Sequence, residues 1–392
     1  MQITDWDTKN SVGYSWHPDY DALRQFINIT PSIEISSNKA VIPSEVQEEF
    51  YRLFDATRTS FVKEHCPAAI ECGLELSRHY KALCTGLLSE TGLSQAEASD
   101  DLRWFLEDPV DGLRRFLSNP LFKLLGGQIG VEEFTQIASD KINSAFATLF
   151  HHGYQRWVSL AIIRRLLPEG SYRVPAMDAI YDVLMGEGHE RPGQHKDEVP
   201  EAKEVQNISF EQHPIVSFIV PCVTVHSRRT GAFAALHTDF HEAEWTARRR
   251  SSNAEWYEIA ALKAEHGFIN RRPDLLKKAW YELEPILPDL ALYTAGEVND
   301  LALIADFKYM LRPSINLAIM ESPDLEASTK PDDLKRRLLA LRPRHGAFII
   351  CRQALSEATV AALGNEDDIK VICAGYDEAA LEPIISLISP QT

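Results

Sequence analysis

Apolar and polar positions follow two rhythms along the chain. Through the first 170 residues the apolar positions recur at three- and four-residue steps, most clearly between Val131 and Ile162, and this spacing predicts amphipathic helices. Beyond that point, β-branched runs bounded by turn residues predict strands. The pattern therefore predicts a mixed α+β or α/β fold, with a mainly helical domain at 1–170 and an α/β domain with a mixed sheet at 171–392.

Local signals predict where several helices begin and end. Pro43-Ser44-Glu45-Val46-Gln47 indicates a capping box, and a second box is predicted at Ser94–Glu97, because a hydroxyl followed three residues later by Glu or Gln can satisfy free amides. Pro168-Glu-Gly170 should stop the longest helix. His151-His152 lies inside that helix, where adjacent side chains point about 100° apart and rarely share a ligand.

The stretch 216–236 predicts a β-hairpin. Val216–Val225 is β-branched and alternating, Ser227–Gly231 is a polar connector that contains a glycine, and Ala232–Leu236 is apolar. A glycine between two such runs is typical of a hairpin turn. The returning strand would deliver His237 to its carboxyl-terminal end, which is where ligands usually bind in open α/β sheets.

The carboxyl-terminal tail at 347–388 predicts a βαβ-like unit with parallel strands. Neither Gly364 nor Gly375 belongs to a G-x-G-x-x-G or phosphate-loop pattern, so no nucleotide cofactor is expected. The remaining strands and helices predicted here are Leu290–Thr294, Leu301–Phe307, Ile315–Met320, Ala347–Cys351, Ser356–Leu363, Ile369–Ala374 and Glu378–Leu387.

Composition restricts the class of partner. The chain has 392 residues, 57 acids, 40 Lys and Arg and a formal charge of −17, so an acidic protein of this kind is not expected to bind nucleic acid. No apolar run reaches the roughly 18 residues that span a bilayer, and no signal peptide is evident, so neither a membrane nor secretion is expected. Six cysteines without a C-x-x-C pair favour free thiols and a cytoplasmic location.

Histidines gather in the middle of the chain. Seven of the 13 fall between His189 and His266. Residues 186–205 are polar, rich in turn formers and without periodicity, which indicates a long loop. This enrichment points to a site in the same region.

The segment His237-Thr-Asp239-Phe-His241 is the densest group of ligand side chains. In an extended strand alternate residues share one face, so two imidazoles and one carboxylate could meet a single divalent ion. These ligand types suit zinc, iron or manganese. We therefore expect a metal-dependent hydrolase that activates water, with Glu242 or Glu244 as general base and a small molecule as substrate.

Other interpretations of the same residues stay open. His237 and Asp239 with the distant His345 would form the ligand set of a non-haem iron oxygenase, and Arg352 would anchor an acidic co-substrate. Asp239 and Glu242 can instead cap a helix, and His237 can act as a metal-free acid or base.

A non-catalytic function is a further hypothesis. The chain could be a subunit or protein-binding module that docks a protein partner through its helical domain, because that long helical region shows no convergent polar groups. We also expect the chain to self-associate as a homo-oligomer.

The sequence predicts that limited proteolysis cuts first between Gly186 and Pro200, because that stretch lacks apolar anchors. Mass spectrometry of the first fragments measures this. If a predicted helix is cut while residues 186–200 stay intact, the division at residue 170 is contradicted.

Overall fold

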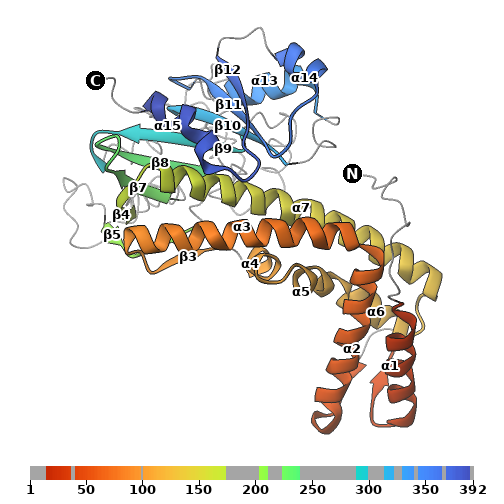
Figure 1. Ribbon diagram of the computed structural model, residues 1–392. Coiled ribbons are helices and arrows are strands. Elements are labelled where there is room, and N and C mark those ends of the chain that lie inside the picture. Colours follow the sequence, from red (N-terminus) through yellow and green to blue (C-terminus); the bar gives the residue numbers. More distant parts are fainter. Residues whose placement is uncertain are drawn as a thin grey trace, which may run out of the picture. The chain divides into compact units, whose positions relative to one another are not determined.

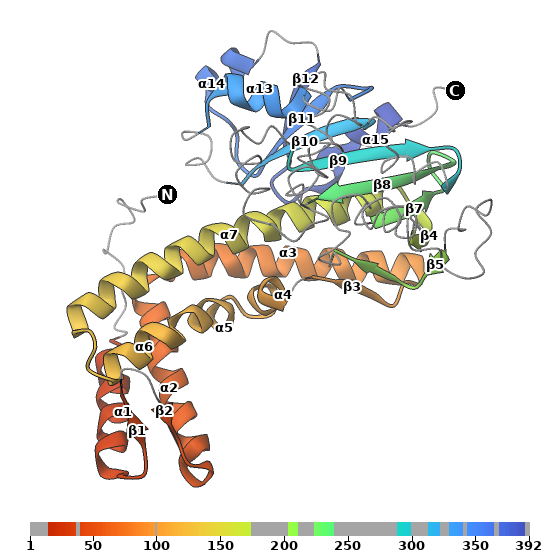
Figure 2. The same cartoon turned by 180° about the vertical axis from the view of Figure 1, so that it is seen from behind.

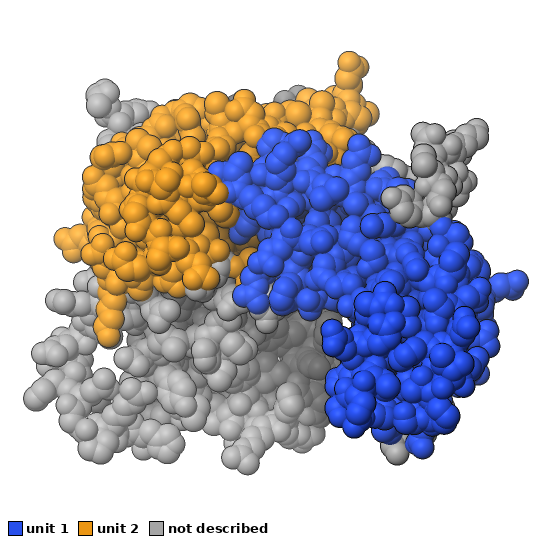
Figure 3. All heavy atoms as spheres, turned by 60° about the horizontal axis from the view of Figure 1, so that its bottom comes forward, with its two compact units in different colours: residues 1–82, 99–154 blue, residues 83–98, 155–392 orange. Residues whose placement is uncertain are grey.

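The computed structural model describes ten stretches of the chain, and they divide into two compact units (Figure 3). The helical unit takes residues 1–82 and 99–154, and the sheet unit takes residues 83–98 and 155–392. The predicted domain boundary near Gly170 stays a prediction. The stretches described are 15–36, 40–98, 100–173, 203–210, 223–238, 288–298, 313–321, 329–339, 343–363 and 368–388.

The helical unit confirms the helix pattern of the amino-terminal region. A two-residue strand β1 (Glu34–Ile35) pairs antiparallel with β2 (Ala40–Val41). Two helices, α3 and α7, extend from this unit into residues assigned to the sheet unit. The helices are α1 (His17–Ile29), α2 (Ser44–His65), α3 (Pro67–Thr91), α4 (Asp100–Glu107), α5 (Pro109–Arg114), the 3-10 helix η2 (Arg115–Leu117), α6 (Ser118–Leu125) and α7 (Val131–Arg165).

Aromatic side chains form the core of the helical unit. Trp16, Phe61 and Phe134 are fully buried, and their ring centroids lie 5.1 to 5.4 Å apart. Edge-to-face and tilted ring pairs at this spacing add to the stabilisation that burial provides. The three residues come from the start of α1 and from α2 and α7, so the cluster joins segments that are distant in sequence.

Both predicted capping boxes are wrong. Ser44 is already the first helical residue of α2, its N-cap is Pro43, and no side chain caps the helix. Gln95–Glu97 is a strand, β3, parallel to β6 (Asn207–Ser209). The Ser94 amide and hydroxyl both donate to the Gln206 carbonyl, at 2.8 and 2.9 Å. A distant strand partner therefore uses the groups that a cap would have used.

An eight-stranded sheet dominates the sheet unit (Figures 1 and 2). The order of its strands is β12-β11-β10-β9-β8-β7-β4-β5. The strands are β4 (Pro168–Arg173), β5 (Lys203–Val205), β7 (Val223–Ser227), β8 (Ala232–Thr238), β9 (Leu290–Ala295), β10 (Ile315–Met320), β11 (Ala347–Cys351) and β12 (Ile369–Cys373). The helices of this unit are α13 (Pro331–Leu339), α14 (Glu357–Leu363), the 3-10 helix η4 (Glu378–Leu381) and α15 (Glu382–Ile388).

The strand directions confirm the predicted mixed sheet. β7 and β8 form an antiparallel hairpin, and Gly231 in its turn has a φ of 62°, which glycine adopts without strain. β11 pairs parallel with both β10 and β12, as the βαβ-like tail predicts. β9 is antiparallel to β8 and to β10, so β8 runs in the same direction as β10, β11 and β12.

Helices cover both faces of the sheet. On one face, α13 and α14 contribute Leu334, Leu338 and Leu363 to a buried cluster with β10, β11 and β12. Asn316 of β10 is fully buried there and donates to the Leu338 carbonyl at 2.7 Å. Figures 1 and 2 show the carboxyl-terminal part of α7 beside β7 and β8. Residues 155–163 of that helix are buried all round, which is typical of a central helix.

Ion pairs hold the last helix against the β7–β8 turn. Glu382 of α15 accepts hydrogen bonds from Arg165 of α7 and from both terminal nitrogens of Arg229 in the turn. A two-pronged arginine–carboxylate pair fixes orientation as well as distance. The hairpin that carries His237 is thereby fixed to two helices.

The predicted loop at 186–205 is described only at its end. Within the predicted loop at 186–205, Lys203–Val205 form the edge strand β5 instead, and residues 186–202 lie outside the described stretches. Among the helices in the described stretches, none is long and apolar enough to cross a bilayer.

Among the glycines that the structure describes in the sheet unit, Gly346 should be the least tolerant of a side chain. Its φ is 82°, and a Cβ there would meet the Asp368 carbonyl oxygen at 2.5 Å. We expect Gly346→Ala to lower the free energy of unfolding by about 1–3 kcal/mol, measured by urea titration. Gly296→Ala is the matched control, because its Cβ would meet nothing within 4 Å. Equal stability of the two variants would contradict the strained turn before β11.

Candidate functional site

His237 lies inside the sheet, next to the last residue of β8. Its side chain is 2% exposed, and its strand partner on β9 is Ala291. The sequence placed His237 just after the strand, but β8 continues to Thr238. The imidazole is therefore a buried polar group in a sheet interior, where hydrogen bonds or a ligand must compensate for lost water.

The register of the sheet extends from His237 across three more strands. Ala291 pairs with Asn316, and Asn316 with Ala347. Side chains of such register partners share one face of the sheet, so His237 and the buried Asn316 face the same side. They flank Ala291, which is fully buried as well.

β8 ends at the same end of the sheet as the parallel strands β10, β11 and β12. Thr238 pairs with Leu290 on β9, Leu290 pairs with Leu317 on β10, and Leu317 pairs with Phe348 on β11. Beyond that level β10 and β11 each continue for three residues, to Met320 and Cys351. We call the end of the sheet at which β8, β10, β11 and β12 terminate the carboxyl edge. It is the side at which open α/β sheets usually bind ligands.

Asp289, directly before β9, connects this edge to two helices. One oxygen of its carboxylate accepts from the Ile319 amide at 2.8 Å, and the other accepts from Arg337 of α13 at 2.6 Å. Its main-chain carbonyl accepts from Gln155 of α7 at 2.5 Å. Both carboxylate oxygens thus accept a hydrogen bond, and Asp289 positions the strand ends at this edge.

Glu321 and Arg352 extend the polar part of the carboxyl edge. Glu321 follows β10 and is 7% exposed, and Arg352 follows β11. The Arg352 Nε donates to the Glu321 carbonyl at 2.9 Å, and the Arg352 amide donates to Met320 at 3.0 Å. These bonds fix the backbone and the Nε of Arg352 beside the end of β10.

Sequence reasoning singled out Arg352 but missed Asp289 and Glu321. Each carboxylate directly flanks an apolar strand, Asp289 before Leu290 and Glu321 after Met320. An acid at a strand end is the local signal that could have found them. Which strands are neighbours, however, is not visible in the sequence.

Four of the predicted site residues lie where the structure gives no description. Asp239, His241, Glu242 and Glu244 lie outside the described residues, so their predicted roles stay predictions. In the stretches that the structure describes, no group of three or more His, Cys, Asp or Glu side chains could hold a metal ion.

His345 does not join His237. It is exposed in the turn before β11, and its amide donates to Ser314 at the end of the sheet opposite the carboxyl edge. Three strand spacings, about 14 Å, also separate β11 from β8. Desolvation and the charge of Arg344 hold the pKa of His345 below its usual value. The described geometry therefore gives no support to the ligand set that includes His345.

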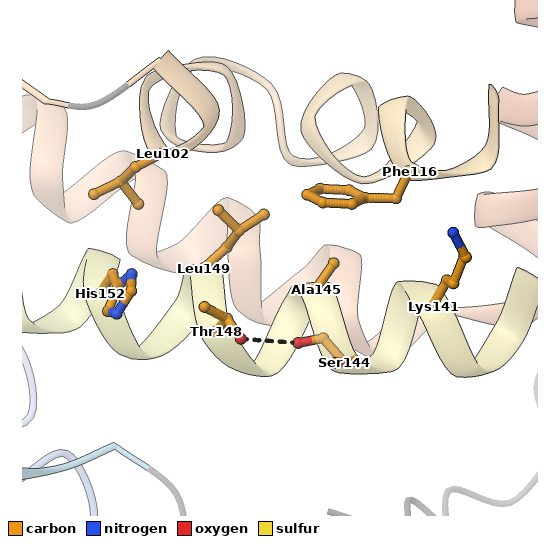
Figure 4. A pocket seen from close by; sticks show the side chains of 8 residues that line it. All are labelled: Leu102, Phe116, Lys141, Ser144, Ala145, Thr148, Leu149 and His152. Atoms are coloured by element: carbon orange, nitrogen blue, oxygen red, sulfur yellow. Dashed lines mark hydrogen bonds between the residues drawn. The ribbon is translucent and has the colours of Figure 1, made fainter. Parts of the chain in front are cut away.

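A concave site lies in the helical unit (Figure 4). We call it the helix groove, with a volume of about 510 Å³. Its residues are Leu102 of α4, Phe116 of η2 and, from α7, Lys141, Ser144, Ala145, Thr148, Leu149 and His152. A volume in this range, with apolar walls and few polar groups, is typical of small-molecule sites.

The helix groove combines an apolar wall with a polar stripe. Leu102 and Leu149 are 3% and 6% exposed and form part of the wall. Thr148 uses its hydroxyl to bond the Ser144 carbonyl at 3.2 Å. Lys141, about one turn before Ser144 on α7, is exposed. An amphipathic anion would therefore find an apolar surface and one positive charge.

Comparison with family models, with curated proteins and with solved structures finds no match to this chain. Function must therefore be inferred from the residues themselves.

The helix groove should bind an aromatic anion such as 1-anilinonaphthalene-8-sulfonate. We expect Lys141→Glu to weaken that binding roughly three- to tenfold, because an attractive exposed charge becomes a repulsive one, and Ala145→Trp to weaken it further by filling the groove. Fluorescence titration measures both effects. Lys123→Glu, an exposed lysine outside the groove, is the control. If all three variants bind the dye like the wild type, the groove is not its site.

Proposed function

We propose that the protein is a divalent-metal-dependent hydrolase. His237, Asp239 and His241 would hold the ion, and Glu242 or Glu244 would act as general base. The observation that supports this most is the direction of β8, which runs parallel to β10, β11 and β12. Its extended backbone at His237 also favours a two-residue ligand spacing.

The fit of His237 to a metal rests on its surroundings. The imidazole is almost completely buried, and neutral imidazole is the commonest protein ligand of transition metals. Its strand neighbour Ala291 has a small side chain and is itself fully buried. A bound zinc, iron or manganese ion would supply Lewis-acid activation of water or of a substrate carbonyl.

The described residues of the carboxyl edge would serve binding and orientation. Arg352, whose Nε donates to the Glu321 carbonyl at this edge, would attract an acidic group of a small-molecule substrate. Asp289 would hold the Ile319 amide and Arg337 in place, which fixes the strand end beside which the substrate would lie. Iron in place of zinc would favour oxygenase chemistry with the same three ligands.

The alternative function is that of a non-catalytic binding module. The observation that favours it is the helix groove, which belongs entirely to the helical unit. In this case an acidic, amphipathic partner segment would occupy the groove with a carboxylate near Lys141. Substitutions at His237 would then leave partner binding unchanged.

The hydrolase proposal predicts about one divalent ion per chain in protein purified without chelator, measured by plasma mass spectrometry. His237→Ala combined with His241→Ala should lose that ion while keeping the wild-type circular dichroism spectrum. His345→Ala, which changes an exposed histidine at the opposite end of the sheet, should retain it.

Two results would reject the hydrolase. Wild-type protein that contains no metal and takes up none from zinc, manganese or ferrous salts has no such site. Retention of a stoichiometric ion by the folded double variant would place the metal elsewhere and remove the role proposed for His237.

A further inference from the structure

We propose that Cys351 and Cys373 form a redox modification site, a dithiol that reacts with small disulfides of the glutathione type to give an intramolecular disulfide. The inference concerns two residues that the proposed hydrolase does not use. The redox proposal does not depend on the hydrolase proposal.

The register of β11 and β12 places the two cysteines side by side. The strands are parallel, and Cys351 is the register partner of Cys373. Neighbouring strands lie about 4.8 Å apart, and register partners project to the same face. Disulfides typically join residues whose Cα atoms lie about 4.4–6.8 Å apart, so the backbone already provides the required spacing.

The ends of the two strands are held together by their backbones. The amides of Ala374 and Gly375 both donate to the Cys351 carbonyl, at 2.9 and 3.3 Å. Gly375 has a φ of 53° and turns the chain just after Cys373. The backbones of Cys351 and Cys373 therefore stay adjacent while the sheet is folded, and formation of the disulfide requires rotation of the two side chains.

The two thiols differ in access to solvent. Cys373 is exposed, whereas Cys351 is fully buried in the cluster beneath α13 and α14. An accessible cysteine next to a protected resolving cysteine is the arrangement found in redox-sensing sites. Cys66 provides a contrast, since it is buried and desolvation raises its pKa to about 12, which keeps it a thiol at neutral pH.

The reaction balances with glutathione disulfide as oxidant. The Cys373 thiolate attacks one sulfur of glutathione disulfide, a mixed disulfide forms, and one glutathione thiolate leaves. The Cys351 thiolate then attacks the Cys373 sulfur and releases the second glutathione. Two protein thiols lose two electrons and two protons, and one glutathione disulfide becomes two glutathiones.

Peptide mapping of the full chain after treatment with glutathione disulfide tests the proposal. Free thiols are blocked with N-ethylmaleimide before acidic digestion, which prevents exchange. We expect a linked pair of peptides that contain Cys351 and Cys373. Its mass should be two hydrogen atoms below the sum of the two reduced peptides, and dithiothreitol should separate them. The Cys351→Ala variant should instead keep glutathione on Cys373, because no resolving thiol remains.

Cys72→Ser is the control and should still form the linked pair, since Cys72 lies on α3. A persistent glutathione adduct on Cys373 in wild-type protein would overturn the proposal, because it would show that Cys351 does not resolve it. A map in which Cys373 carries only N-ethylmaleimide after exhaustive oxidation would overturn it as well. Neither result depends on whether Cys351→Ala folds, and neither bears on metal binding.

Discussion

Asp289 is the residue on which the arrangement of the sheet unit most depends. It lies at the start of β9, the strand that separates β8 from β10. Its amide donates to Leu317, its carboxylate accepts from the Ile319 amide and from Arg337, and its carbonyl accepts from Gln155. One short side chain and its peptide groups therefore fix β9 against β10, α13 and α7. Because β9 is antiparallel to both of its neighbours, β8 and β10 point the same way.

This arrangement determines which side chains can meet. With β8 parallel to β10 and β11, its last residue, Thr238, lies at the end of the sheet where Glu321 and Arg352 follow their strands. The same arrangement keeps His345 at the opposite end of β11. The proposed metal chemistry, the role suggested for Arg352 and the neighbouring Cys351–Cys373 pair all belong to the strands that β9 aligns.

The parts of the fold that local chemistry determines could be predicted from the sequence. Gly231 between two apolar runs predicted the hairpin, and the apolar runs at Ala347–Cys351 and Ile369–Cys373 predicted parallel strands, which the register confirms. The box predicted at Ser94–Glu97 failed because that segment pairs with β6, a partner more than 100 residues away along the chain. Asp289 and Glu321 were missed for the same reason: their neighbours are set by strand order, which no local pattern reveals.

The central claim is that a divalent ion binds at the carboxyl edge of the sheet, and its location can be measured directly. Mn²⁺ is paramagnetic and broadens the nuclear magnetic resonance signals of amides close to it, so titration into deuterated, ¹⁵N-labelled protein maps the site. The account predicts early and selective broadening of the amides of Thr238, Glu321 and Arg352, while Arg344 and Gly346 at the opposite end of the sheet stay sharp. Broadening that begins at Arg344 and Gly346, or that spreads evenly over the acidic surface, would contradict it.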